Sequence, residues 1–578
     1  MTTELAPPAR TMPRSLPIIA AVAVAAITVG GVAGAFLLGD RTAGAGSAAG
    51  YVPADVPFYL ELRLDPSDAQ DAALRELLGH FPPIEGIDLD RPLFDQLGEA
   101  VDEAAASADE TDLRWADDVA TWFDGHVTLA VTDVPLEPAA DGSEPMPEML
   151  VVLGSTDADA ARAATERMRA EAGTDVQFTE TEHRGVTITT TADEQGAYAI
   201  TDDAVLLAPT AAEIEAALDI QAGAAESLGD GERLADAAGE LPDDWLAFAV
   251  YDVGDLVSAS LDAGDAPDVS TEPLRALLAQ QPMRGAMAVT ADGDRLALTS
   301  VSDVPTGDFT MENADRGLAD EVPADALYYA DGGNIGSSLA AFITALKESV
   351  AGQPEAADQI ATAEAALGAD LEELVSWVDD AALVIGMDGD TPYGGAVLVP
   401  SDADAPQRRI GQLVTFARLG AMDSSSGITV DERDVDGTTV TSITWRPASF
   451  GADGMMAGPD GATIEVATTD DRAYLAVGEG SVERLLTVDA GDSLATVDRF
   501  TDAVDQLGGS DNVGTVWLDL RGVRTAIESA LGPMLDEMDP DGAYQREVLP
   551  WLEPLDRMVG VTRVEGDRAV QRSVLLVD

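Results

Sequence analysis

Two kinds of hydrophobic spacing follow one another along most of this chain. Residues 56–64 place apolar side chains at about every second position, which is the spacing of a strand that buries one face. Leu74, Leu77 and Phe81 then recur at helical spacing, after Ser67, a residue type favoured at a helix N-terminus. The chain therefore opens with a predicted strand followed by an amphipathic helix.

The same change of spacing recurs to residue 303, without a regular strand–helix–strand order. This pattern predicts an α+β fold with a mainly antiparallel sheet and helices packed on one of its faces. The predicted strands are 127–132, 149–153, 176–181, 186–191, 197–201, 204–208 and 245–251, with a hairpin over 285–302. The predicted helices lie near 91–104, 112–123, 210–220 and 232–239, and a further helix begins at residues 155–157.

A Val-Pro-Ala-Asp segment opens this pattern twice, at residues 52–55 and again at 322–325. Other segments return in the same order, with offsets of 270 at the first segment, 255 at a tryptophan, 245 at Asp-Ala-Asp-Ala and 268 at Thr-Asp-Asp. A period this long is typical of two domains rather than of a solenoid. We predict two tandem homologous units at 51–303 and 321–578, joined by a linker at 304–320.

The N-terminal region predicts a membrane anchor. Residues 18–38 form an uncharged apolar run of 21 residues, and a helix rising about 1.5 Å per residue would span a hydrocarbon core of roughly 30 Å. Arg10 and Arg14 in the tail, 1–17, place the N-terminus in the cytoplasm by the positive-inside rule. Residues 39–50 form a flexible Gly/Ala/Ser tether, whose small residues leave a cleaved signal peptide as an alternative.

The charge balance restricts the possible partners. The chain has 106 acidic and 32 basic residues and a net charge of −74, so it repels nucleic acid and anionic lipid headgroups. Cations can gather on such an acidic surface, and a basic protein is a further possible partner. The apolar fraction of 46% is ordinary for a folded protein.

The usual residues of catalysis and metal binding form no motif here. The chain has no cysteine, which excludes disulfides, thiolate ligands and cysteine nucleophiles. The three histidines, His80, His126 and His183, fit surface or capping positions better than a metal site, and none belongs to an HExxH motif. No nucleophile elbow, P-loop or dinucleotide motif is present.

Carboxylates are too numerous for any one pair to indicate catalysis. Residues 537–542 place acids at alternate positions before a glycine, as in a calcium loop, but Val548 stands where a bidentate glutamate belongs. A turn is the better interpretation of that segment. We therefore predict no catalytic, cofactor-binding or metal-binding residues, no cofactor, and a protein that is not an enzyme.

A short membrane anchor, a tether and a V-P-A-D segment that opens a tyrosine-bearing strand resemble an uncharacterised bacterial domain-of-unknown-function family of membrane-anchored extracytoplasmic proteins. The resemblance covers about residues 50–578. It implies a topology and a location, and it implies no activity.

These observations favour a single-pass protein whose bulk lies outside the membrane and binds a ligand or partner, or acts as a scaffold, at the cell surface. Two alternatives stay open. A carrier of an apolar ligand such as a lipid predicts a cavity lined by Leu, Val and Met. A cryptic hydrolase predicts a clustered carboxylate pair with a raised pKa in a cleft.

Overall fold

The computed structural model describes residues 47–578 except 85, 108–113, 136–146, 172–176, 192–195, 264–269, 390, 423–426, 446–461, 490 and 539–541. The predicted tail and membrane helix, most of the predicted tether and the core of the calcium-like segment lie outside these residues. No helix within the described part of the chain is long and apolar enough to cross a membrane.

The chain forms two compact units, which are interleaved in sequence. Unit 1 comprises residues up to Leu256 together with Arg284–Leu296, and unit 2 comprises Val257–Met283 and Ala297–Asp578. Residues 257–283 belong to unit 2 because helix α8 (Glu272–Leu278) packs against helix α9 (Ile335–Val350). The division therefore follows packing rather than the order of the chain.

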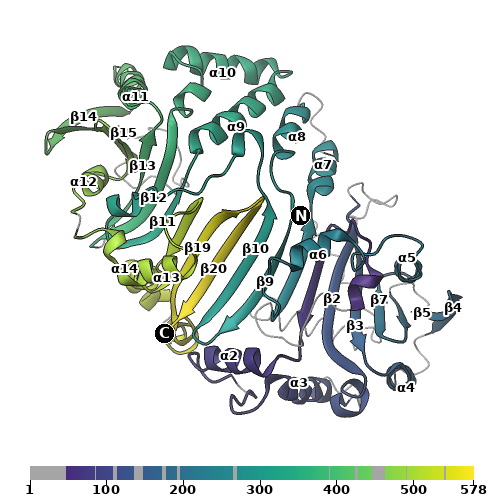
Figure 1. The fold of residues 1–578 in the computed structure, drawn as a ribbon. Helices are drawn as coiled ribbons and strands as arrows, with labels where there is room; N and C mark the ends of the chain where they lie inside the picture. Colours follow the sequence, from purple (N-terminus) through teal and green to yellow (C-terminus); the bar gives the residue numbers. More distant parts are fainter. Residues whose placement is uncertain are drawn as a thin grey trace, which may run out of the picture. The chain divides into compact units, whose positions relative to one another are not determined.

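Unit 1 is built on an antiparallel sheet with the strand order β4-β5-β6-β7-β3-β2-β1-β8-β9 (Figure 1). The predicted strands are all present, displaced by only a few residues. The strands are β1 Phe58–Arg63, β2 Phe123–Asp133, β3 Glu148–Ser155, β4 Phe178–His183, β5 Val186–Thr191, β6 Ala197–Ile200, β7 Ala204–Ala208, β8 Ala247–Asp252 and β9 Arg284–Asp292. The helices are α2 Asp68–Leu78, α3 Leu93–Ser107, α4 Ala158–Glu171, α5 Ala211–Gln221 and α6 Glu232–Ala238, and α7 Gly254–Ala263 runs into unit 2.

Unit 2 repeats this strand order as β14-β15-β16-β17-β13-β12-β11-β18-β19, with β20 added beyond β19 (Figure 1). Its strands are β11 Ala326–Gly332, β12 Val378–Asp388, β13 Thr391–Pro400, β14 Ile428–Val435, β15 Thr438–Trp445, β16 Ala462–Thr468, β17 Ala473–Val477, β18 Gly514–Leu518, β19 Leu555–Glu565 and β20 Arg568–Val577. Strand β10, Arg295–Asp303, begins in unit 1 and continues into unit 2. Besides α8 and α9, its helices are α10 Pro354–Leu367, α11 Ala405–Ala421, α12 Ser481–Leu486, α13 Asp498–Gln506, α14 Leu520–Met538 and α15 Leu549–Leu552.

Both Val-Pro-Ala-Asp segments make the same backbone clamp at the start of a strand. In unit 1 the amide of Leu228 donates to the carbonyl of Val52 at 2.8 Å, and in unit 2 the amide of Leu494 donates to the carbonyl of Val322 at 2.8 Å. Both valines are fully buried. The proline that follows Val52 also bridges to Ser227, as Pro323 does to Ser493 in the second unit. The repeated sequence thus corresponds to a repeated piece of structure.

The expectation that helices cover one face of the sheet is wrong for unit 2. Val384 and Val397 share a core with Phe500 of α13. Ala381 and Leu398, which point to the opposite face, pack in a separate cluster that includes residues of α9 and α11. Because these strands carry small or apolar residues at consecutive positions, both faces are apolar enough to bind helices. Tryptophans 122, 245, 377 and 517 are all buried.

Candidate functional site

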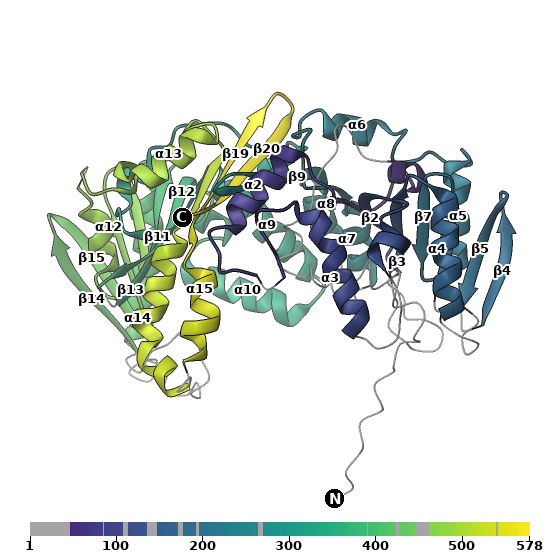
Figure 2. The ribbon, with the colours of Figure 1, turned by 90° about the horizontal axis from the view of Figure 1, so that it is seen from below.

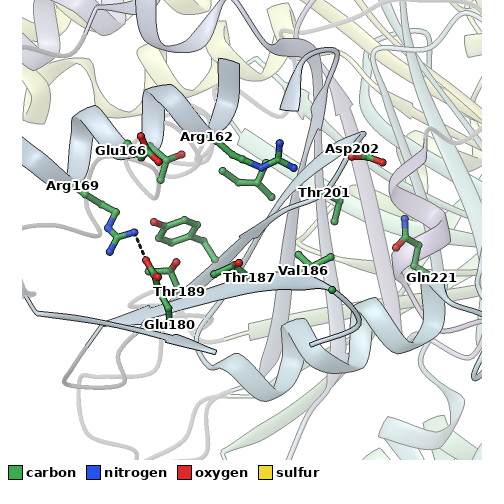
Figure 3. Close-up of a pocket in the computed structure, with 14 residues that line it drawn as sticks. Arg162, Glu166, Arg169, Glu180, Val186, Thr187, Thr189, Thr201, Asp202 and Gln221 are labelled. Atoms are coloured by element: carbon green, nitrogen blue, oxygen red, sulfur yellow. Dashed lines mark hydrogen bonds and ion pairs between the residues drawn. The ribbon is translucent and has the colours of Figure 1, made fainter. Parts of the chain in front are cut away.

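A polar cavity of about 520 Å³ lies in unit 1 between helix α4 and strands β4, β5 and β6 (Figure 3). This volume is within the range of roughly 300–1,000 Å³ typical of small-molecule sites. Polar side chains dominate the lining, which consists of Arg162, Thr165, Glu166, Arg169, Glu180, Gly185, Val186, Thr187, Thr189, Tyr198, Ile200, Thr201, Asp202 and Gln221.

The first turn of α4 is held in place by backbone contacts. The amide and hydroxyl of Thr156 both donate to the carbonyl of Trp122, at 2.7 and 3.2 Å. The carboxylate of Asp157 then accepts from the amide of Ala160 at 3.0 Å, which satisfies one of the free amides of the helix start. The start of the helix is therefore fixed against Trp122, the residue that precedes β2.

One face of α4 supplies the helical wall of the cavity. Thr165 and Glu166 each lie three or four residues from both Arg162 and Arg169, so the four side chains leave the helix on one side. The helix also buries Ala164 completely. Small buried residues bring the helix close to the sheet, while the longer polar side chains line the cavity beside it.

The opposite wall comes from alternate positions on two strands. Thr187 and Thr189 of β5 point to the same face of the sheet, as do Tyr198 and Ile200 of β6. The turn between β4 and β5 passes through Arg184 at φ 52°, followed by a glycine at φ 83°. Figure 2 shows α4 and α5 beside β4 and β5.

Ion pairs fix the two arginines of the cavity. Arg169 Nη1 lies 2.8 Å from Glu180 Oε1, and its guanidinium stacks 4.8 Å from the ring centroid of Phe178. Burial lowers the pKa of Arg169, but the hydrogen bond that it donates to Glu180, together with its interactions with Tyr198, outweighs burial, so the pKa is raised and the side chain stays charged. Arg162 Nη1 lies 2.8 Å from the exposed Asp159. Neither guanidinium is a bare cation.

A hydrogen-bond network closes one end of the cavity. The hydroxyl of Tyr51 lies 2.7 Å from Thr201 Oγ1, donates to Asp203 and accepts from Gln221 Nε2 at 2.8 Å. Burial and the neighbouring Asp203 raise the pKa of Tyr51 far above its usual value, so the hydroxyl keeps its proton. The network orients Thr201 and Gln221 toward the cavity.

A smaller cavity of about 360 Å³ lies in unit 2 beside the second Val-Pro-Ala-Asp segment. Two of the charged side chains that line it already form an ion pair. Arg484 pairs with Asp325, and the hydroxyl of Tyr393 donates to the same carboxylate at 3.0 Å. This cavity presents fewer available polar groups than the one in unit 1.

The three histidines lie on different elements. His80 follows α2, His126 lies on β2 with its Nδ1 atom 3.6 Å from Asp124, and the Nε2 atom of His183 lies 2.7 Å from Asp219. Within the described residues, no group of three or more His, Asp or Glu side chains is arranged to hold a metal ion.

Sequence reasoning missed the cavity residues, Arg169 and Tyr198 above all. Neither belongs to a motif, and the two are brought together only by the packing of α4 over β6. The repeat offsets align both positions with apolar residues in the second unit. This exchange of apolar for polar residues was the one signal in the sequence that could have indicated the cavity.

The fold is α+β with mainly antiparallel pairing, and its candidate site is the polar cavity of unit 1. The model of one family, described as "Protein of unknown function (DUF3352)", matches residues 18–549, and the chain belongs to this family. No curated protein matches the chain.

Solved structures of TP0453 show weak similarity to this chain. Crystal form III has 11% identity and a TM-score of 0.23, covering 46% of this chain and 82% of that one. Crystal form I has 10% identity and a TM-score of 0.22, covering 46% and 81%. At such TM-scores the likeness carries no argument about the present protein.

Proposed function

We propose that this protein is a non-enzymatic binding protein of the cell surface, held outside the membrane by residues 18–38, and that the unit 1 cavity is its ligand site. The cavity itself is the observation that carries the proposal. Its lining is polar, it has the volume of a small-molecule site, and backbone contacts fix its helical wall. A preformed site of this kind suits binding, because little ordering entropy is lost when a ligand enters.

The repeated strand order and the two matching clamps support a second part of the proposal. We infer that the two halves arose by duplication of one α+β unit. The cavity is then a feature of the first copy, and the second copy is free to serve another role.

The test is native mass spectrometry of the full chain in detergent, purified from its own host, before and after stripping. We expect an added mass of a small polar molecule on the wild-type chain and its loss in Arg169→Ala. Arg167→Ala is the matched control, because Arg167 lies on the same helix but pairs with Asp118 outside the cavity. A bare wild-type mass, or equal occupancy in both variants, would contradict the proposal.

The same preparation separates binding from catalysis. A bound molecule that is returned to the chain and recovered unchanged after prolonged incubation supports a binding protein. Recovery of a hydrolysed product would instead favour the cryptic hydrolase.

The anchor has its own test. The full chain should stay in the membrane fraction at alkaline pH, whereas a chain lacking residues 18–38 should be released. Release of the full chain would refute an uncleaved anchor.

A lipid carrier is a second candidate, and one observation favours it. The most exposed large hydrophobic side chains of the described chain all belong to unit 2. Ile385, Val477 and Ile464 form one row across its sheet, joined through Gly394, and are 47%, 61% and 44% exposed. An added mass of lipid size that is lost in Ile385→Asp would support a carrier of acyl chains, and retention in that variant would oppose it.

A further inference from the structure

The two units place corresponding helices by the same contacts, which allows them to be compared residue by residue. In unit 2 the amide and hydroxyl of Ser401 donate to the carbonyl of Trp377 at 2.8 and 3.1 Å. Thr156 makes the same two bonds to Trp122 in unit 1. Helix α11 therefore corresponds to α4 with an offset of 245 residues.

This offset pairs two residues of the cavity wall with apolar residues of unit 2. Thr165 corresponds to Ile410, and Arg169 corresponds to Val414. Thr165 and Ile410 are both buried, whereas the half-buried Arg169 is replaced by a buried valine. The helices thus keep the same orientation while the chemistry of their inward face changes.

The strand wall of the cavity also has a polar residue where unit 2 has an apolar one. The turn after β6 is closed by the amide of Thr201 donating to Ala204, and the turn after β16 by the amide of Thr469 donating to Arg472. The resulting offset of 268 pairs Tyr198 with Val466.

The three apolar counterparts contact one another in unit 2. Ile410, Val414 and Val466 form a single buried cluster, and α11 packs directly on β14, β15 and β16. The space that is a polar cavity in unit 1 is therefore filled with aliphatic side chains in unit 2.

We propose that the cavity of unit 1 binds one neutral carbohydrate per chain and that unit 2 carries the same site in a permanently closed form. This inference rests on the proposed binding function and names its ligand class and its stoichiometry.

The lining selects against other classes of ligand. It contains three carboxylates and two guanidiniums, and both guanidiniums already contact carboxylates, so an anion gains little and meets repulsion. Because both guanidiniums are paired, they do not exclude an organic cation, and choline therefore serves as a probe in the binding experiment. An apolar ligand would leave buried hydroxyls and charges without partners, which costs free energy.

A neutral carbohydrate matches the groups that remain. Sugar hydroxyls both donate and accept, and the lining offers carboxylate acceptors at Glu166 and Asp202, guanidinium donors, and the threonine hydroxyls of β5, which do both. The ring of Tyr198 supplies an apolar face for the C–H side of a sugar ring. Figure 3 shows Glu166 and Arg162 on the helical wall and Asp202 near Thr201.

The experiment transplants the unit 2 cluster into unit 1. The triple variant Thr165→Ile/Arg169→Val/Tyr198→Val, in the full chain in detergent, should fold because unit 2 already packs these residues together. Binding of glucose, galactose, N-acetylglucosamine, maltose and sucrose is measured by saturation-transfer NMR and calorimetry, with glutamate and choline as charged probes. Arg167→Val is the matched control on the same helix.

We expect one neutral sugar to bind with a stoichiometry of one, at least about tenfold more weakly in the triple variant and unchanged in the control. Glu166→Gln/Asp202→Asn, which keeps the shape of the cavity, should also weaken binding and serves if the triple variant does not fold. A stoichiometry of two would overturn the closed site in unit 2.

The remaining outcomes separate this inference from the proposed function. Glutamate or choline binding that the triple variant abolishes would overturn the carbohydrate assignment and leave the ligand site standing. If no probe loses affinity in either cavity variant, both the carbohydrate assignment and the cavity as ligand site are refuted.

Discussion

Removing Arg433 should destabilise unit 2 and make its stability depend on pH in a defined direction. Glu465 on β16 is fully buried. Arg433 donates to both of its carboxylate oxygens, with 3.1 Å between Nη2 and Oε2. Ser442 Oγ and the amide of Val482 add further donors at 3.0 and 3.1 Å. In Arg433→Met the carboxylate keeps two of its donors and loses its counter-charge.

The cost follows from these contacts. Breaking a buried ion pair by removing one partner typically costs about 3–5 kcal/mol. We expect the lower end, about 3 kcal/mol at pH 7, because two donors to the carboxylate remain and because Arg433 is 31% exposed.

The pH dependence has a definite sign. Burial raises the pKa of Glu465, but the hydrogen bonds and charge of Arg433, together with hydrogen bonds from backbone amides, outweigh burial and hold the pKa below its usual value. In the wild-type chain this group therefore stabilises unit 2 above the unfolded pKa of about 4.3, and the contribution is lost as the pH falls through the folded pKa. In Arg433→Met burial dominates, and we expect the pKa of Glu465 to be higher in the folded than in the unfolded chain. The loss of unfolding free energy is then complete at pH 7. As the pH falls below the raised pKa, about 1.4 kcal/mol of that loss is recovered per pH unit.

Hydrogen exchange of β14–β16 peptides between pH 7.5 and 5, corrected for the intrinsic exchange rate, reports this difference. The peptides of β4–β6 in unit 1 are an internal control. The double variant Arg433→Met/Glu465→Gln keeps the shape of the residue 465 side chain but has no titrating group there. Its loss of stability should therefore not change with pH. A defect in Arg433→Met that stays constant or grows as the pH falls would refute the reasoning.

Three further substitutions test local packing, each measured by urea unfolding. Ser67→Ala removes the hydroxyl that caps α2 through two amides and should cost about 1 kcal/mol. Gly98→Ala should be destabilising, because the added Cβ would lie 2.1 Å from the ring of Trp115. Helix propensity alone would favour alanine over glycine by about 1 kcal/mol, so a gain in stability would show that this contact is wrong. Tyr51→Phe removes one of the two donors to Asp203, the other being Thr201 Oγ1, together with the acceptor of Gln221. It should cost about 1–3 kcal/mol, and an unchanged midpoint would show that the network does not contribute to stability.

The strands could be predicted because their signal is local. Alternation placed β5 at residues 186–191, its bounds in the structure, and located the hairpin at 285–302 to within one residue at each end. The predicted helix near 112–123 shrinks to one wide turn at Trp115–Val119. The rings of Trp115 and Phe123 pack edge to face with centroids 6.1 Å apart, and this tertiary contact outweighs helix propensity.

The cavity depended on information that no local pattern holds. Whether Arg169 lines a cavity or a surface is decided by its distance from β6, which is set by the packing of α4. The sequence did contain indirect evidence of the cavity, because the repeat offsets align Arg169 with Val414 and Tyr198 with Val466. Comparing two copies of one fold shows where a core position has become polar, and a single copy cannot show that.

The clamp at the first Val-Pro-Ala-Asp segment also has a mechanical consequence. Backbone bonds join residues 49–54 to residues 226–229, including Gly229 to Ala49 at 3.0 Å and Ala54 to Glu226 at 3.1 Å. A pulling force applied through the N-terminus reaches these bonds before it reaches β1. We therefore expect these bonds to break before tension reaches the first strand and the rest of the sheet.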